Sequence, residues 1–315
     1  MNEKHINNNF EGFDEVIDIK ELFFALWERK ILITTITTFF AIVSVIYALS
    51  IPNIYSSKAI LAPASESSSL SSKLGGLSAF AGMAGVNLSS DSSDPSVEAI
   101  ERITSFDFFS SHILPNIKLE NLMSVKSWSL SSNILSYDEE IFDASTKKWT
   151  RKVKPPKSII PSEQEAYRSF KKIISVTVNK KNNYINISIN HKSPYVAKRW
   201  LDLVILNINE SMRAEKKKIV ESSIDFLNEI SVTTNINTIK GGIVKLLESQ
   251  IQSLMMISSS KDYVFKIIDS PQVPELKSSP NRPIICMTIT FLGGILSLIL
   301  ALTLHFINRH SIQSK

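Results

Sequence analysis

The stretch ILITTITTFFAIVSVIYALSI, residues 31–51, contains no Lys, Arg, Asp or Glu, and neither does IICMTITFLGGILSLILALTLHFI, residues 284–307. A helix rises about 1.5 Å per residue, so each stretch covers roughly the 30 Å hydrocarbon core of a bilayer. The first stretch fits a cleaved signal peptide poorly, because such peptides have apolar regions of only about 7–15 residues near the N-terminus. The sequence therefore predicts two transmembrane helices, one near each end.

The distribution of positive charge predicts how these helices are oriented. Lys20, Arg29 and Lys30 precede the first apolar stretch, whereas Lys58 alone follows it closely. This asymmetry favours a cytoplasmic N-terminus, and two spans return the chain to the same side. The predicted order is a cytoplasmic tail at 1–30, a transmembrane helix at 31–51, an extracytoplasmic domain at 52–283, a second transmembrane helix at 284–307 and a cytoplasmic tail at 308–315.

The composition excludes several classes of protein. The chain has 315 residues, of which 43% are hydrophobic and 21% charged, too apolar for a disordered chain. The single cysteine, Cys286, lies in the second apolar stretch, so no disulfide holds the outer domain. A net charge of +5 is a mild excess over so large a surface, and it predicts no nucleic-acid partner.

The first half of the outer domain mixes strands and helices. Residues 54–61 alternate as in a strand that leaves the membrane, and the glycine-rich stretch 65–94 predicts a mobile loop. That loop lacks the Lys-Ser/Thr ending of a phosphate-binding loop. A helix is expected from Pro95 to Leu114, because Val97, Ile100, Ile103 and Phe106 recur every three residues. Short strands and a Pro155-Pro156 turn are expected in 122–160.

Clear start signals mark the next elements. Ser162 and Glu165 have the spacing of a capping box and predict a helix. A β-hairpin follows, since Ile174, Val176 and Val178 alternate before the Lys180–Asn183 turn, and Ile185, Ile187 and Ile189 alternate after it.

A long helical arm is predicted from Ser193, an N-cap followed by Pro194 at the first helical position. Its expected buried residues are Val196, Trp200, Leu203 and Ile208, followed by Val220, Ile224 and Leu227 in polar company. A second run has the 3,4,3 spacing of a coiled-coil seam: Val244, Leu247, Ile251 and Leu254. We expect two helices that meet near Thr233–Gly242, with two ordinary helices of a compact domain as the alternative.

A strand is expected at Tyr263–Asp269, followed by a proline-rich segment containing Pro271, Pro274, Pro280 and Pro283. Proline fixes φ and lacks an N–H, so this segment should be stiff and excluded from a sheet interior. It would hold the outer domain at a set angle above the second helix. The fold class is α+β with two terminal transmembrane helices.

No catalytic, metal or cofactor site is predicted. The five histidines, His5, His112, His191, His305 and His310, form no zinc pattern, and no nucleophile-elbow or Walker motif occurs. In the second apolar stretch, Gly293-Gly294 allows close helix approach or local helix flexibility, and the sequence leaves both open.

Several segments resemble the Wzz-type chain-length determinants, the polysaccharide co-polymerases of bacterial polysaccharide assembly. They are IDIKELFFALWERK before the first apolar stretch, PNIYSSKAIL after it, PSEQEAYRSF, HKSPYVAKRWLDLV, and YVFKIIDSPQVPELKSSPNRP before the second. The order of these segments between two terminal helices is specific, although no single motif decides the match.

The resemblance implies a Gram-negative inner-membrane protein with a periplasmic domain. It implies an α/β base (52–192 and 262–270), a helical arm (193–261) and the proline-rich segment (271–283). It further implies a homo-oligomeric ring, such as an octamer, without enzymatic activity, which sets lipopolysaccharide O-antigen length with a Wzy-type polymerase on the growing polysaccharide chain. The eight residues after the second stretch leave no room for the kinase domain of related autokinases.

Other functions remain open at this stage. The alternatives are a length regulator for enterobacterial common antigen, a capsule-export adaptor, a periplasmic sensor and an extracytoplasmic enzyme. The short tails argue against a sensor, and the scattered histidines and carboxylates argue against an enzyme.

Overall fold

The computed structural model describes residues 26–64, 95–234 and 237–313, and the chain forms two compact units. One unit contains two apolar helices, α2 (Lys30–Ser50) and α11 (Arg282–Gln313). The other unit is Pro52–Ser279, the outer domain. The glycine-rich loop predicted at 65–94 lies outside the described residues.

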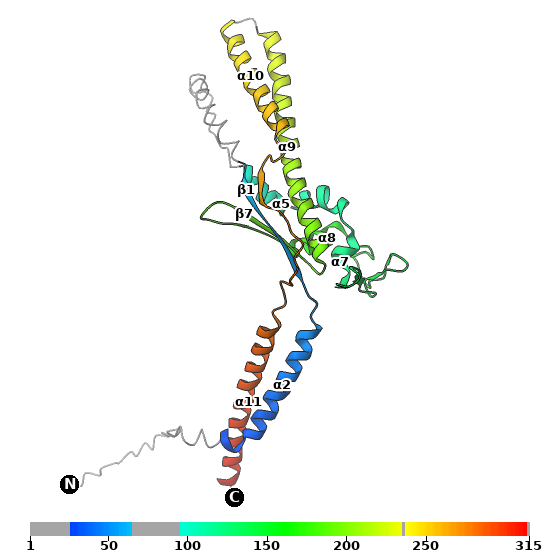
Figure 1. The fold of residues 1–315 in the computed structure, drawn as a ribbon, viewed down its shortest axis with the longest axis vertical. Helices are drawn as coiled ribbons and strands as arrows, with labels where there is room; N and C mark the ends of the chain where they lie inside the picture. The colour runs from blue at the N-terminus through cyan, green and yellow to red at the C-terminus, as the bar shows by residue number, and fades with distance from the viewer. Residues whose placement is uncertain (1–25, 65–94, 235–236, 314–315) are drawn as a thin grey trace, which may run out of the picture. The chain divides into compact units, whose positions relative to one another are not determined.

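Helices α2 and α11 pack against each other in antiparallel directions (Figure 1). At one end of the pair, Arg29 Nη2 donates to the carbonyl oxygen of Leu304 at 3.4 Å. At the other end, Arg282 Nε donates to the carbonyl oxygen of Ala48 at 3.1 Å. The two helices therefore contact each other along the whole length of α2, and we call this unit the helix pair.

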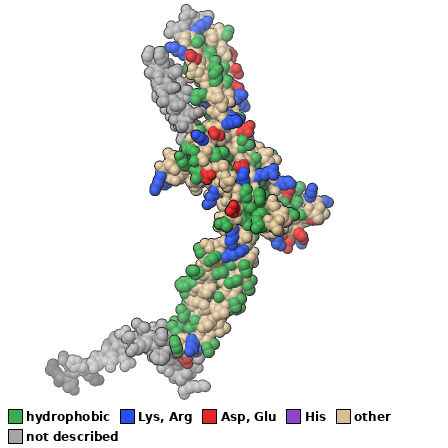
Figure 2. Space-filling view, viewed as in Figure 1, with side chains coloured by type: hydrophobic (Ala, Val, Ile, Leu, Met, Phe, Trp, Pro, Cys, Tyr) green, Lys and Arg blue, Asp and Glu red, His purple; other side chains and the backbone are tan. Residues whose placement is uncertain are grey.

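Small side chains fill the contact between the two helices, and large apolar side chains face outward. Ser44, Ala48, Ser297 and Ala301 are buried, whereas residues such as Phe39, Ile46 and Phe291 are exposed. Figure 2 shows hydrophobic side chains over the helix pair and charged ones only at its ends. The core helix of a soluble protein would be mostly buried instead. Both predicted apolar helices are thus confirmed as long and apolar enough to cross a bilayer.

The outer domain is built on a four-stranded antiparallel sheet in the order β6-β7-β1-β8. The strands are β1 (Tyr55–Pro63), β6 (Ile174–Val178), β7 (Ile185–His191) and β8 (Phe265–Asp269). The predicted strands and hairpin are confirmed, with β8 starting two residues later than expected. Strand β7 ends at His191 and β8 begins at Phe265, with helices α9 and α10 between them, whereas β1 precedes both. The sheet therefore joins distant parts of the chain.

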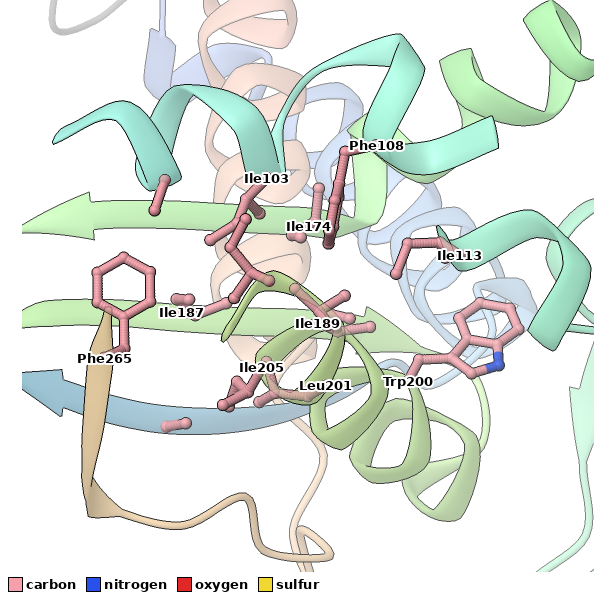
Figure 3. Packing of buried hydrophobic residues seen from close by; sticks show 14 of the residues in the cluster. Ile103, Phe108, Ile113, Ile174, Ile187, Ile189, Trp200, Leu201, Ile205 and Phe265 are labelled. Atoms are coloured by element: carbon pink, nitrogen blue, oxygen red, sulfur yellow. The ribbon is translucent and has the colours of Figure 1, made fainter. Parts of the chain in front are cut away.

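Helices cover one face of this sheet. Alternate residues of β1 and β7 point into the core, including Ala59, Leu61, Ile187 and Ile189, all at most 1% exposed. They pack with the first turns of the long helix α9 (Pro194–Thr233), where Leu201 is fully buried (Figure 3). Alternation of this kind is what a sheet with one solvated face requires.

The helix predicted from Pro95 to Leu114 is broken. Helix α5 (Pro95–Ile103) ends before Thr104, and the Ser105 side chain accepts from the backbone N–H of Phe108 to start a new helical turn. The chain continues as α6 (Phe106–Phe108), the π-helical turn η1 (Phe109–Ile113) and the 3₁₀ turn η2 (Leu114–Asn116). The break rotates the chain, so Phe108 and Phe109 are buried while the expected core residues Val97 and Phe106 are exposed.

Short elements follow, as the mixed pattern of 122–160 predicts. They are helix α7 (Leu119–Met123) and two small hairpins, β2 (Val125–Trp128) with β3 (Leu135–Tyr137), and β4 (Phe142–Asp143) with β5 (Lys148–Trp149). The Asp143 carboxylate accepts hydrogen bonds from the Ser145 and Thr146 hydroxyls, which lower its pKa and close the turn between β4 and β5.

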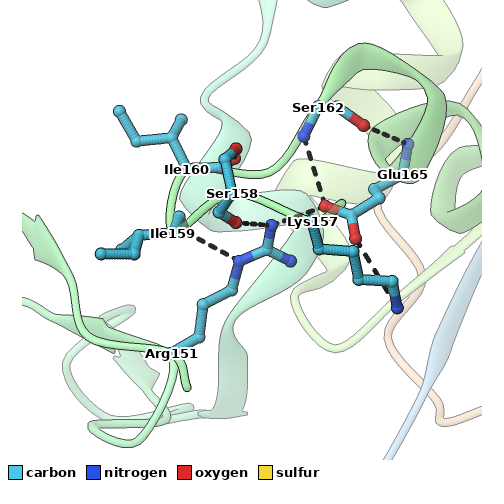
Figure 4. A network of polar contacts seen from close by, with 7 residues as sticks. All are labelled: Arg151, Lys157, Ser158, Ile159, Ile160, Ser162 and Glu165. Carbon is cyan, nitrogen blue, oxygen red and sulfur yellow. Dashed lines mark hydrogen bonds and ion pairs between the residues drawn. The ribbon is translucent and has the colours of Figure 1, made fainter. Parts of the chain in front are cut away.

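The predicted capping box of Ser162 and Glu165 is confirmed at the start of α8 (Glu163–Ile173). Figure 4 shows that Glu165 also forms an ion pair with Arg151, at 2.5 Å, which ties the segment before the helix to its first turn. The Arg151 hydrogen bond is the main reason that the pKa of Glu165 is lowered, with a further contribution from the Ser162 backbone N–H.

The long arm consists of α9 and α10 (Asn237–Ser259), which pack against each other. Helix α9 begins as predicted, with the Ser193 side chain accepting from the N–H of Val196 and Pro194 in the first turn. Residues of α9 up to Met212 are part of the outer domain's core, and the arm extends beyond them (Figure 1).

A buried asparagine joins the two ends of the arm. Asn209 of α9 is 7% exposed, and its Oδ1 accepts from the backbone N–H groups of Val264 and Phe265, both at 2.9 Å. Its Nδ2 donates to the carbonyl oxygen of Phe265 at 3.0 Å. One turn along α9, Arg213 Nη1 donates to the carbonyl oxygen of Ser260 at 3.3 Å. These contacts, the Asn209 clamp, fix the chain that leaves α10 to the helix that enters the arm.

The clamp predicts a large effect of a small substitution. Asn209→Ala leaves two buried N–H groups and one carbonyl without their partner, which should lower the free energy of unfolding by about 2–4 kcal/mol. Asn207→Ala is a matched control, because Asn207 donates to the Leu203 carbonyl of its own helix and should cost about 0.5 kcal/mol or less. Thermal unfolding of the purified full-length chain measures both, and equal effects would contradict the clamp.

Candidate functional site

The residues singled out in the sequence lie on the arm, the proline-rich segment and the helix pair. Among the described residues, no group of three or more His, Cys, Asp and Glu is placed to hold a metal ion.

His191, at the junction of β7 and α9, is buried and has structural partners. Its Nε2 lies 2.9 Å from the Asn121 carbonyl, and its Nδ1 accepts from the Ser193 N–H. Burial lowers its pKa, which favours the neutral ring that this pair of bonds requires.

Within one chain, the residues of the predicted seam divide between two sides of α10. Leu247 and Leu254 are half-buried, whereas Val244 and Ile251 are 59% and 41% exposed. The most buried residues of α10 are Ile243 and Ile257, at 6% and 5%. The stripe that packs inward therefore begins one residue before the predicted seam, at Ile243, and extends three residues beyond it, to Ile257. Val244 and Ile251 remain available on the surface of the single chain.

The exposed side of α10 continues the apolar character of these two residues. Val244, Ile251 and Met255, at intervals of seven and four, form one stripe along the helix, and all three are exposed. Helix α9 also exposes apolar side chains on the arm, including Ile219 and Phe226. We call Val244, Ile251 and Met255 the outer arm stripe.

The proline-rich segment runs beside the start of β1. The Ser57 hydroxyl donates to the carbonyl oxygen of Gln272 at 2.8 Å. Farther along, Ile54 and Ser279 form an antiparallel bridge in which the Ile54 N–H donates to the Ser279 carbonyl at 2.9 Å. The segment is thus attached to the strand at two points and remains outside the four-stranded sheet.

The four prolines differ in their surroundings. Pro271 is buried, although it lies outside the sheet, and Pro274 and Pro280 are half-buried. Pro283 is exposed in the first turn of α11, where a missing N–H is tolerated because no helical carbonyl precedes it.

The two adjacent glycines of α11 have different neighbours. A Cβ added to Gly293 would lie 2.5 Å from Cβ and Cγ of Phe40, too close for any side chain without movement of α2. A Cβ added to Gly294 would have no atom within 4 Å. Of the two explanations left open by the sequence, close helix approach therefore applies to Gly293.

Some positions with long-range contacts gave no signal in the sequence. Asn209 and Arg213 belong to a polar stretch of α9 that is typical of a solvated face. Ser44 and Ser297 are buried in the contact between α2 and α11. Hydropathy shows only that both serines belong to an apolar run and does not distinguish them from the other residues of that run. In both cases only the partner element shows why the residue is there.

Comparison with known proteins adds a family to this geometry. Residues 15–111, which include α2, β1 and α5, match the family model described as Wzz, chain length determinant protein. Over this segment the chain is similar to the Wzz family. The resemblance predicted from the sequence is confirmed over that range. The chain matched none of the curated proteins with which it was compared.

Two solved structures are similar to the chain. A full-length bacterial polysaccharide co-polymerase has 12% identity and a TM-score of 0.40, and the match covers 93% of this chain and 99% of that one. A fragment of WzzB, a polysaccharide co-polymerase from Salmonella Typhimurium, has 14% identity and a TM-score of 0.34, with coverage of 72% and 100%.

The contact at Gly293 predicts how the helix pair responds to bulk. In membranes, a cysteine introduced at Ser44 should form an oxidative cross-link with Cys286, because the Cys286 sulfur lies 3.8 Å from the Ser44 carbonyl oxygen. Gly293→Leu should reduce the yield of this cross-link severalfold by forcing the helices apart.

Gly294→Leu is the matched control and should leave the yield unchanged, since the added side chain meets open space. The product is detected as two membrane fragments that stay joined after proteolysis of the outer domain. Equal yields from both leucine variants would show that Gly293 does not set the helix spacing.

Proposed function

We propose that this chain regulates the length of a bacterial surface polysaccharide, O-antigen in the first instance, as a non-enzymatic scaffold. The observation that carries the proposal is the Wzz segment at residues 15–111, because it includes the first apolar helix and the strand at the centre of the outer sheet. The segment therefore contributes to both units of the molecule and is no detached module.

The placement in a membrane supports the same proposal. Two apolar helices enclose the outer domain in sequence, and Arg29 and Lys30 stand before the first of them. By the positive-inside rule, the ends of the chain would be cytoplasmic and the outer domain periplasmic, with the bacterial inner membrane as the location. A periplasmic domain is on the side where a Wzy-type polymerase would act on its growing polysaccharide.

Self-association is the second part of the proposal. The outer arm stripe presents apolar side chains that nothing in the described chain covers, and Val244 and Ile251 belong both to it and to the seam predicted from the sequence. Burial of such a stripe between copies would stabilise a homo-oligomer by roughly 25 cal/mol for each Å² removed from water. The ring of copies would then present the arms to the polymerase and to the polysaccharide together.

The proline-rich segment would set the angle of the outer domain. Its two attachments to β1 and the fixed φ of its prolines restrict its motion, so Pro274 and Pro280 are the residues that we assign to this role, with Pro271 packed inside. Gly293 would serve the same end by holding α2 and α11 at close distance.

A deletion strain tests the function. Cells without the chain should still make the polymer, but with a different length distribution on a gel, and the wild-type gene should restore the original distribution. Ile251→Asp should fail to restore it although the chain is folded, because a charge in a buried interface between copies weakens assembly. Gln252→Asp introduces the same charge at the adjacent exposed residue and should restore it.

Two results would contradict this function. One is an unchanged length distribution of all surface polysaccharides in the deletion strain. The other is loss of a surface polysaccharide altogether, rather than a change in its length, which would indicate an export adaptor.

A further inference from the structure

The hairpin of β2 and β3 has an apolar tip. Leu130 is 81% exposed and Ile134 64% exposed, and both stand in the turn that joins the strands. The turn is well defined, because the Ser129 N–H donates to the Ile134 carbonyl at 3.0 Å and Asn133 adopts a left-handed conformation with φ of 52°. An ordered turn that keeps two large aliphatic side chains in water needs an explanation outside the outer domain's own packing.

Three aromatic rings continue this apolar surface. The Trp128 ring stands edge-to-face on Tyr55 of β1 with centroids 5.3 Å apart, and it lies 6.2 Å from the ring of Tyr195 of α9. Trp and Tyr prefer the interface between lipid and water, where the ring is apolar and the polar atom remains hydrated. The rings connect the hairpin tip to the first residue of β1.

The charge of this region is suited to a lipid surface. Residues 121–137 contain no Asp or Glu, and Lys126 of β2 is exposed. Lys192 donates to the Val125 carbonyl at the start of the same strand, and its partial burial lowers its pKa. The exposed Lys126 can attract anionic headgroups, and the nearest acidic side chain in sequence is Asp138, which follows the hairpin and lies near Lys192.

The chain itself limits how far this surface can be from the bilayer. Only residues 51–54 separate Ser50, the last residue of α2, from Tyr55. At roughly 3.6 Å per residue, the Tyr55 backbone lies within about 18 Å of the end of the apolar helix whatever the orientation of the outer domain. Trp128 contacts Tyr55, so the hairpin is tethered close to the membrane surface.

We propose that the hairpin tip, Leu130 and Ile134, together with the Trp128 ring, is a second membrane contact that inserts into the interfacial layer of the bilayer that α2 and α11 span. The occupant is lipid, and the proposal depends on the membrane spans but not on the polysaccharide role. A sugar is a poorer partner, because the one N–H of the Trp128 indole is already donated to Asn133 Oδ1 at 2.8 Å. The side chains of Leu130 and Ile134 offer a sugar no hydrogen bond.

The contact would fix the outer domain on the membrane at a point beside its two covalent connections. A body held by two adjacent connections can still tilt, whereas a third point of contact removes that freedom. The hairpin would therefore help to set the direction of the arm.

Spin labels on the full-length chain in lipid nanodiscs test the proposal. Cys286→Ser removes the native thiol, and Leu130→Cys then carries the label. Val232→Cys is the matched control, because Val232 is 82% exposed at the end of α9 and close in exposure to Leu130. Collision rates with oxygen, which partitions into lipid, and with a water-soluble nickel chelate are measured at both positions.

Lipid contact predicts that the ratio of oxygen to nickel collisions is severalfold higher at residue 130 than at residue 232. Equal ratios would overturn the proposal and leave the tip in water, open to a glycan. A fall in both collision rates at residue 130 would also overturn it, since that is the signature of burial against protein, such as a second copy.

Discussion

The Asn209 clamp is the contact on which the geometry of the molecule depends. Helix α9 leads away from the four-stranded sheet and α10 leads back to it, and the described residues between Pro194 and Ser259 form no strand. Asn209 binds the backbone on both sides of Phe265, and Arg213 binds Ser260 one turn farther along. In the chain, β7 precedes α9 and β8 follows α10, and in the sheet these two strands lie on either side of β1. Both ends of the arm are therefore fixed to the same sheet.

The connections between the outer domain and the helix pair are short. The outer domain is connected to the helix pair at two points, after α2 and before α11, and the bridge between Ile54 and Ser279 brings these two connections together. Any preference in the direction of the arm therefore has to arise from short segments: the proline-rich segment, the start of β1 and the surface around Tyr55. A protein that acts through shape would be sensitive to these segments more than to any single reactive side chain.

Elements with a local chemical signal could be predicted from the sequence. Ser162 with Glu165 and Ser193 with Pro194 mark helix starts, because a side chain a few residues away satisfies the free N–H groups. The alternation in β6 and β7 and the uncharged runs of α2 and α11 are likewise properties of single segments. The break at Ser105 was missed because apolar residues continue at helical spacing on both sides of it.

Contacts that depend on a distant partner could not be predicted. Ile243 and Val244 are adjacent apolar residues of α10, and only the position of α9 decides that the first is buried and the second exposed. Gly293 and Gly294 differ for the same reason, since Phe40 stands against one of them. The sequence around Asn209 predicts an exposed residue, and only its hydrogen bonds to the start of β8 explain its burial. In each case the sequence gives the residue type, and the tertiary contact gives its role.

For the proposed regulation of polymer length, the Asn209 clamp would hold the arm in one direction, and Arg213→Ala tests this role most directly. This change removes the hydrogen bond to Ser260 but leaves Asn209 in place, so the chain should fold and reach the membrane at the wild-type level. The measurement is the length distribution of the surface polysaccharide on a gel. The account predicts a broader distribution or a shift toward short chains. An unchanged distribution, with the thermal midpoint of the chain lowered, would show that the clamp contributes to stability alone and would contradict the account.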